Sequence, residues 1–266
     1  MERGRPLPPN LVGTSAGAAI AAACLTTGPI AALEACRALY ADNLSNFRWR
    51  SLLNRRVEFA HQRIYPAWIG TFVSDDTFPI LLKAKSRLVV AVSRPSRVLG
   101  LAGSVGVGTL AYIVDKKVWH SLHPRLPRVL GLRLDFLPID GCATAAEALR
   151  LLCASAAPPP ILPARRVAGR FAFDGGYTDN APMPQLSAAE QAISLTLLTR
   201  HYPQREPFFR HGQRWYAQPS RPVPVSTWDC TYKATVDAAF ALGQRDALGL
   251  ERELRSRFPF GDAMSD

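Results

Sequence analysis

The sequence predicts an α/β fold, and three observations carry this prediction. A Gly-x-Ser-x-Gly motif at residues 13–17 stands between a short apolar run and an alanine-rich stretch, the order of a strand–turn–helix unit. Short apolar runs recur at 88–92, 132–137 and 171–173, with helix-like patterns between them. The length of 266 residues, with 48% hydrophobic residues, is enough for one large domain, or a domain with an extension.

The motif at residues 13–17 makes Ser15 the candidate nucleophile. A serine hydroxyl is a poor nucleophile unless the fold exposes it and a base accepts its proton. A tight turn between strand and helix meets the first need, and Gly13 and Gly17 leave room on both sides of the serine. A position near a helix start also places free N–H groups where negative charge develops. Taken alone the pattern is weak, because chains rich in Gly, Ala and Ser contain it by chance.

The same region permits a second interpretation, as a targeting segment. Residues 11–33 carry no charge and follow Met1-Glu2-Arg3-Gly4-Arg5, as in a secretion signal or a membrane span. The stretch consists mostly of Ala, Gly, Ser and Thr, however, and it lacks the leucine-rich centre of an export signal. A strand, an elbow and a helix explain these residues better.

The other elements follow in order. We expect helices over 16–26 and 30–43, short helices over 45–87, strands at 88–92 and 132–137, and a helix over 144–154. The second helix should bury the face made by its apolar residues, which are Ile30, Leu33, Cys36, Leu39 and Tyr40. Beyond a proline-rich loop at 157–163 we expect strands at 171–173, 193–199 and 214–218 and a terminal helix over 235–258.

The glycine-rich segment 98–114 also has two interpretations. Its run Gly106-Val107-Gly108-Thr109-Leu110-Ala111 has nearly the form of a dinucleotide-binding turn, and Asp135 lies near the spacing of the acid that such a turn needs. Glycines at 100 and 103 disrupt the strand that should precede the turn. A helix or loop of small residues, packed against its neighbours, is the better interpretation.

Composition and charge narrow the class of partner. The formal net charge of +11 comes from scattered arginines and not from one basic run. Because no nucleic-acid motif is present, we expect the basic surface to bind an anionic membrane. Five cysteines without a C-x-x-C pair fit a reducing, cytoplasmic compartment. We interpret His120 and His123 as surface histidines, and we expect no metal and no cofactor. Trp49, Trp68 and Phe72 are the expected membrane-docking side chains.

A second motif, Asp174-Gly175-Gly176, follows the apolar run at 171–173. An aspartate at a strand end can point at a nucleophile on a neighbouring strand, and the two glycines allow close backbone approach. Asp-Gly is also common in simple tight turns, which is the alternative interpretation of this motif by itself.

Together the motifs resemble the patatin-like phospholipases. The resemblance rests on three runs: Gly13 to Ala18, Ala154-Ser155-Ala156-Ala157-Pro158 through Pro163, and Asp174-Gly175-Gly176-Tyr177-Thr178-Asp179-Asn180-Ala181-Pro182. It implies a three-layer α/β/α sandwich with a mixed central sheet. We expect residues 1–184 to form the acyl hydrolase core and 185–266 an extension that completes the sheet edge.

The resemblance also implies a Ser–Asp dyad that cleaves lipid carboxylic esters, as a phospholipase A or lysophospholipase does. Ser15 would attack the ester carbonyl, Asp174 would serve as base, and the backbone N–H of Ala16 would be one oxyanion donor. Members of the family carry a first strand and a glycine-rich oxyanion loop ahead of the elbow, whereas only twelve residues precede Gly13 here. We therefore expect either an internal start or a shortened member that is poorly soluble and nearly inactive by itself. The alternative function is a catalytically impaired lipid-binding or interaction module.

Overall fold

The computed structural model describes residues 7–47, 58–115, 119, 121–159, 161–226 and 228–257, in two compact units, Met1–Pro182 and Met183–Asp266. The first unit contains, in chain order, β1 (Asn10–Gly13), α1 (Ala16–Leu25), α2 (Pro29–Ala41), α3 (His61–Gly70), α4 (Phe78–Lys83), β2 (Arg87–Arg94), α5 (Gly100–Ile113), α6 (Leu126–Val129), β3 (Arg133–Pro138), η3 (Ile139–Gly141), α7 (Ala145–Ser155), β4 (Arg165–Val167), β5 (Arg170–Asp174) and η4 (Gly175–Tyr177). The second contains α8 (Ala188–Ala192), β6 (Leu195–Leu197), β7 (Phe208–His211), β8 (Arg214–Ala217) and α9 (Val236–Arg257).

A mixed five-stranded sheet forms the centre of the first unit, and β2 is its middle strand. Along one edge of β2 runs β3, antiparallel. The opposite edge pairs first with β1, which is parallel and places Gly13 opposite Val90. It then pairs with β5, which is antiparallel and places Asp174 opposite Val92. The strands β1 and β5 therefore end facing each other along the same edge, and β4 extends the sheet beyond β5.

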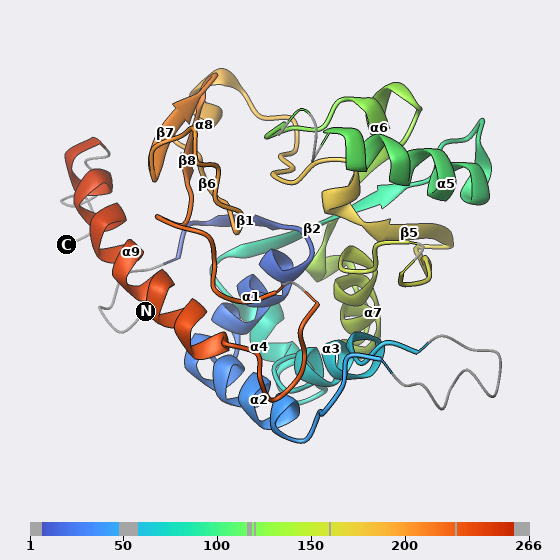
Figure 1. Ribbon diagram of the computed structural model, residues 1–266, viewed down its shortest axis with the longest axis horizontal. Coiled ribbons are helices and arrows are strands. Elements are labelled where there is room, and N and C mark those ends of the chain that lie inside the picture. The colour runs from blue at the N-terminus through green and yellow to red at the C-terminus, as the bar shows by residue number, and fades with distance from the viewer. Residues whose placement is uncertain are drawn as a thin grey trace. The chain divides into compact units, whose positions relative to one another are not determined.

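Helices cover both faces of this sheet (Figure 1): α1, α2, α3, α4 and α7 lie on one side, and α5 and α6 lie on the other. Successive residues of a strand point to opposite faces, so Ala172 joins the large core on the first side, while Phe173 joins Leu132 and Tyr177 in a smaller core on the second. The three-layer α/β/α architecture and the mixed sheet predicted from the sequence are confirmed.

The alanine-rich stretch forms α1 because small side chains let a helix approach a sheet closely. Ala18, Ala19, Ala22 and Ala23 are fully buried. The uncharged residues 11–33 are thus divided among β1, α1 and the start of α2. Within the described ranges, no helix combines the length and the apolar character needed to span a bilayer.

The predicted buried face of α2 is wrong at Ile30, whereas its other residues, Leu33, Cys36, Leu39 and Tyr40, are half-buried. Ile30 is exposed, whereas Ala32 is buried in the core. The reason is the neighbouring helix α3, whose Trp68 donates a hydrogen bond from Nε1 to the carbonyl oxygen of Ala32 at 2.8 Å. The bulky ring of α3 therefore packs where α2 has a small side chain.

The glycine-rich segment forms one continuous helix, α5, over most of its length. Because its glycines lie inside the helix and not in a turn after a strand, the dinucleotide-binding interpretation is wrong. Gly108 has a packing role instead, since a Cβ there would lie 3.1 Å from Tyr177 and 3.2 Å from Leu132. The missing side chain lets α5 contact the segment that follows Asp174.

The second unit contains a three-stranded sheet in the order β6-β8-β7, with β6 parallel and β7 antiparallel to β8. Stacked rings join β7 to β8: Phe208 on Trp215 and Phe209 on Tyr216. The sequence prediction missed β7 and α8, and its strand at 193–199 extends beyond both ends of β6. The terminal helix α9 begins within one residue of its predicted start.

Candidate active site

Ser15 occupies the turn between β1 and α1 in a backbone conformation that side chains rarely adopt. Its φ is 51° and its ψ is −131°. In the described part of the chain, Ala168 is the one other residue besides glycine with a positive φ. Such a conformation costs on the order of 1–3 kcal/mol and persists where the surrounding fold imposes it. A strained serine between a strand and a helix is the geometry of a nucleophile elbow.

The two glycines of the motif differ in their surroundings. A Cβ on Gly13 would lie 2.5 Å from Cα of Ala18, so this glycine lets the first turn of α1 fold back against β1. A Cβ on Gly17 would have no atom within 4 Å. The sequence-based idea that both glycines relieve a clash is therefore right for Gly13 and wrong for Gly17.

The second motif lies directly against the first. Asp174 ends β5 on the same edge of β2 on which β1 ends. A Cβ on the next residue, Gly175, would lie 2.4 Å from Oγ1 of Thr14 and 2.5 Å from the carbonyl oxygen of Ala91. Only a glycine allows so close an approach, so the fold brings the Ser15 elbow and the Asp174 turn into contact over Ala91.

Ser155 ties these segments together. Its hydroxyl donates to the carbonyl oxygen of Ala91 at 2.7 Å and accepts a hydrogen bond from the backbone N–H of Ser15 at 2.9 Å. Two residues further on, the carbonyl oxygen of Ala157 accepts the N–H of Asp174 at 3.1 Å. The end of α7 thus positions both motifs. Ala154 to Pro163 carry part of the family resemblance, but the sequence by itself indicates no role for Ser155.

The carboxylate of Asp174 is half-buried, and its Oδ1 accepts the N–H of Gly176 at 2.8 Å. A Cβ on Gly176 would lie 3.1 Å from this same Oδ1. The turn therefore orients the carboxylate by a hydrogen bond to its own backbone. Ala16 is the first residue of α1, so its N–H has no acceptor within that helix and is available to an anion.

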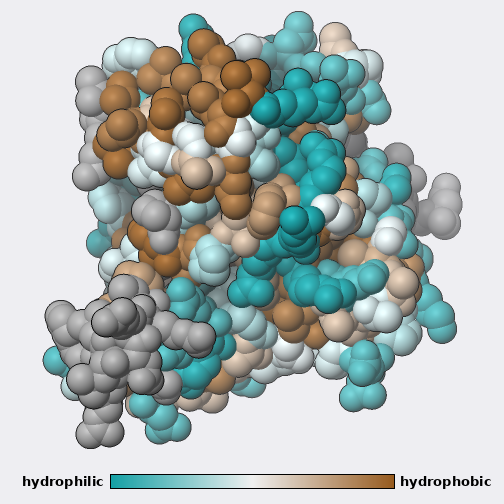
Figure 2. Space-filling view, turned by 90° about the vertical axis from the view of Figure 1, so that its right-hand side faces the viewer, coloured by the Kyte–Doolittle hydropathy of each residue, from teal (hydrophilic) through white to brown (hydrophobic). Residues whose placement is uncertain are grey.

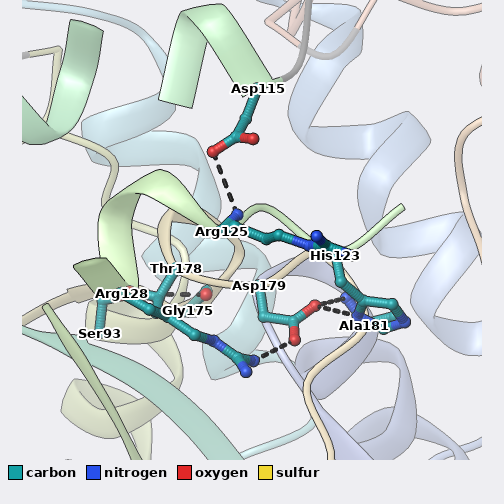
Figure 3. A network of polar contacts seen from close by, with 9 residues as sticks. All are labelled: Ser93, Asp115, His123, Arg125, Arg128, Gly175, Thr178, Asp179 and Ala181. Atoms are coloured by element: carbon teal, nitrogen blue, oxygen red, sulfur yellow. Dashed lines mark hydrogen bonds and ion pairs between the residues drawn. The ribbon is translucent and has the colours of Figure 1, made fainter. Parts of the chain in front are cut away.

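Asp179, the other acidic residue of this loop, is buried in a network of polar contacts (Figure 3). Its Oδ1 lies 2.8 Å from Nδ1 of His123 and accepts the N–H of Ala181 at 3.0 Å, and its Oδ2 pairs with Arg128. The interpretation of His123 as a surface histidine is wrong, because the ring binds this carboxylate. His120 lies outside the described residues.

The same network fastens the loop to the sheet. The carbonyl oxygen of Gly175 accepts the N–H groups of Thr178 and Asp179, each at 3.1 Å. The hydroxyls of Thr178 and Ser93 are 2.7 Å apart, which links the loop to β2. Asp179 therefore shapes the segment after Asp174 from inside the protein.

A hollow of about 220 Å³ lies beside Ala156 and Ala157 and is lined by Arg165 and by three titratable side chains that stay neutral near pH 7. Burial, and then the charge of Arg165, lowers the pKa of His61 to about 4. Burial raises the pKa of Cys153 to about 11. Burial, followed by the nearby Cys153 and Asp174, raises the pKa of Tyr65 well above its ordinary value.

Among the described residues, no group of three His, Cys, Asp or Glu side chains is placed to bind a metal ion.

Comparison with known proteins identifies a family for the first unit. Residues 1–187 match the model of a family described as Patatin-like phospholipase. No curated protein and no solved structure shows a significant match.

Proposed function

We propose that this chain uses Ser15 as nucleophile and Asp174 as base. The chain belongs to the patatin-like phospholipase family and is therefore a lipid carboxylic ester hydrolase. The meeting of β1 and β5 on one edge of β2 supports this assignment, because it sets the elbow and the Asp-Gly-Gly turn against each other.

The chemistry follows from these two side chains. Asp174 accepts the proton of the Ser15 hydroxyl while the serine oxygen attacks the ester carbonyl carbon, and the carbonyl oxygen becomes an oxyanion. The tetrahedral intermediate collapses, the C–O bond to the alcohol breaks, and Asp174 returns the proton to the leaving alkoxide. Water then attacks the acyl-enzyme with Asp174 again as base, which releases the fatty acid and restores the serine.

Stabilisation of the oxyanion is assigned in part to the N–H of Ala16. It lies one residue after the nucleophile, at the positive end of α1. The hydrogen bond between the N–H of Ser15 and Ser155 withdraws that other N–H from the same task and fixes the direction of the elbow. One such donor contributes roughly 10²–10³ in rate.

The substrate class proposed is a phospholipid or lysophospholipid acyl ester. The alternative function is a lipid-binding or interaction module of the same fold without turnover. The two functions separate experimentally, because only the enzyme forms a covalent serine adduct.

The test is covalent labelling with a fluorophosphonate probe and hydrolysis of a short acyl ester. Ser15→Ala should abolish labelling and lower turnover by at least about 10⁴-fold, since the nucleophile is lost. Ser45→Ala, at an exposed serine after α2, is the matched control and should behave as the wild type. Labelling of Ser15→Ala at another residue, with unchanged turnover, would refute the elbow assignment. A wild-type chain that binds lipid but takes no label would establish the alternative.

A further inference from the structure

The helix α5 presents an unusual surface. No charged residue occurs between Val98 and Val114, and the exposed positions of the helix recur at helical spacing. They are Gly100, Ala102, Gly106, Val107, Leu110 and Ile113. Leu110 is 66% exposed. Surface helices of globular proteins place charged and polar residues on this face, so an apolar one indicates contact with something other than water.

The opposite side of α5 is used by the fold. Ser104, Gly108 and Ala111 are buried, and Tyr177 packs there, with its hydroxyl donating to the carbonyl oxygen of Val105 at 3.2 Å and its ring stacked on Tyr112. The helix is therefore well anchored. Because the other side of the helix is already packed in the core, the apolar residues on the exposed side are not exposed by a loosely packed helix.

Basic side chains border this face. An open hollow of about 370 Å³ at the start of α5 is lined by Arg97, Arg166 and Arg170 together with Gly100. Arg166 lies over the ring of Phe171, and Arg170 pairs with Asp135, so both are held in place on the β4–β5 hairpin. Figure 2 shows the resulting pattern, a brown apolar area on the α5 side of the molecule next to teal hydrophilic residues.

We propose that the exposed face of α5 and the arginine-lined hollow beside it dock the protein on an anionic lipid bilayer. Apolar side chains enter the boundary between headgroups and acyl chains, and arginines bind phosphate and carboxylate groups at the same level. Trp119, just beyond α5, is 56% exposed, and tryptophan favours this interfacial depth.

The docking residues expected from the sequence are different, and that expectation is wrong for Phe72 and Trp68. Phe72 is fully buried, and Trp68 packs on it at a ring distance of 5.1 Å while bonding to Ala32. Both belong to the helix layer on the opposite side of the sheet. Trp49 lies outside the described residues.

The buried side of the docking helix α5 is joined to the segment that follows the candidate base. The helix packs on Tyr177, three residues after Asp174, through the space that Gly108 leaves. The docking proposal does not rest on turnover, however, and is tested without it.

The test measures flotation of the Ser15→Ala protein with vesicles of phosphatidylcholine alone or mixed with phosphatidylserine. Binding to the mixed vesicles is expected, and Leu110→Gln should weaken it at least about tenfold, since an inserted leucine is lost. The double variant Arg97→Gln and Arg166→Gln should weaken it about fivefold for each charge removed. Ile80→Gln on α4, and Arg63→Gln with Lys85→Gln, are the matched controls and should bind as the parent does.

Thermal unfolding verifies that each variant is folded, which is expected because the changed side chains are exposed. Three results overturn the proposal: no binding to the mixed vesicles, equal binding to both vesicle types, or a loss of binding in the Arg63→Gln with Lys85→Gln control as large as in the Arg97→Gln with Arg166→Gln variant. A parent dimer that Leu110→Gln converts to a monomer, with vesicle binding unchanged, would instead assign the face to a second copy of the chain. The labelling of Ser15 is measured separately, so a negative result for membrane docking does not change it.

Discussion

Asp174 and Asp179 stand five residues apart, and their carboxylates have different surroundings. Asp174 is half-buried at the end of β5, beside the Ser15 elbow, and Asp179 is buried beneath the loop with His123, Arg128 and the N–H of Ala181 as partners. A base must reach the proton that it takes, whereas a buried, paired carboxylate serves the fold. The geometry therefore favours Asp174 as the base.

This difference predicts opposite phenotypes for two isosteric changes. Asp174→Asn keeps the hydrogen bond from Gly176 possible but removes the proton acceptor, so acylation should fall by several orders of magnitude with little change in unfolding temperature. Asp179→Asn removes a buried charge that Arg128 and His123 face, so it should destabilise the protein by about 3 kcal/mol and reduce activity mainly through the folded fraction. Burst labelling and thermal unfolding, measured on both variants, distinguish the two effects. An inactive but fully stable Asp179→Asn, together with an active Asp174→Asn, would reverse the assignment.

At the scale of single elements, the elbow shows that one motif contains two kinds of glycine. Gly13 ends β1 under the backbone of Ala18, whereas Gly17 lies within α1 and faces open space. Glycine inside a helix is less favourable than alanine by about 1 kcal/mol. The motif pattern alone treats the two positions alike.

Substituting each glycine by alanine should therefore change stability in opposite directions. Gly17→Ala should stabilise the protein by roughly 0.5–1 kcal/mol, because the added methyl meets no atom and the helix gains a better residue. Gly13→Ala should cost roughly 1–3 kcal/mol or more, because the new Cβ collides with backbone and not with a movable side chain. Chemical denaturation of both variants provides the measurement. Equal destabilisation by the two changes would show that Gly17 is also sterically required.

Elements with strong local signals were predictable from the sequence. The elbow, α1, α7 and α9 follow from glycine placement and helical spacing, and β2 from its apolar run. The short strands β4 and β7 were missed because three or four residues, with polar side chains among them, give no clear alternation of apolar and polar positions. Their pairing with β5 and β8 stabilises them, and that pairing is a property of the fold, not of the segment.

The candidate site was predictable in its residues but not in its assembly. Ser15 and Asp174 carry recognisable motifs, yet their convergence depends on both strands choosing one edge of β2, which is non-local. Ser155 escaped notice because a serine at a helix end has no local mark of a role that lies more than one hundred residues away. The outward face of α5 was unpredictable for another reason: a segment apolar on all sides has no polar stripe to orient it.

At the scale of the whole molecule, charge and apolar surface should contribute separately to bilayer binding. The chain has 32 Lys and Arg residues against 21 Asp and Glu, a net charge of +11 spread along the sequence, so many arginines beyond those near α5 attract an anionic surface. Salt screens this attraction, with a Debye length of about 10 Å at 0.1 M and about 3 Å at 1 M. The insertion of apolar side chains is not screened.

A salt series with the phosphatidylserine vesicles should therefore resolve the two contributions. Binding of the parent protein should fall steeply as salt rises and then level off at a residual value that α5 supplies. Leu110→Gln, which changes no charge, should lose this residual value and keep the steep part. The Arg97→Gln and Arg166→Gln variant should keep the residual value and start from weaker binding at low salt, with a shallower slope, because fewer charges are there to screen. A parent curve that falls to zero at high salt, identical to that of Leu110→Gln, would mean that α5 inserts nothing and that the net charge alone holds the protein at the surface.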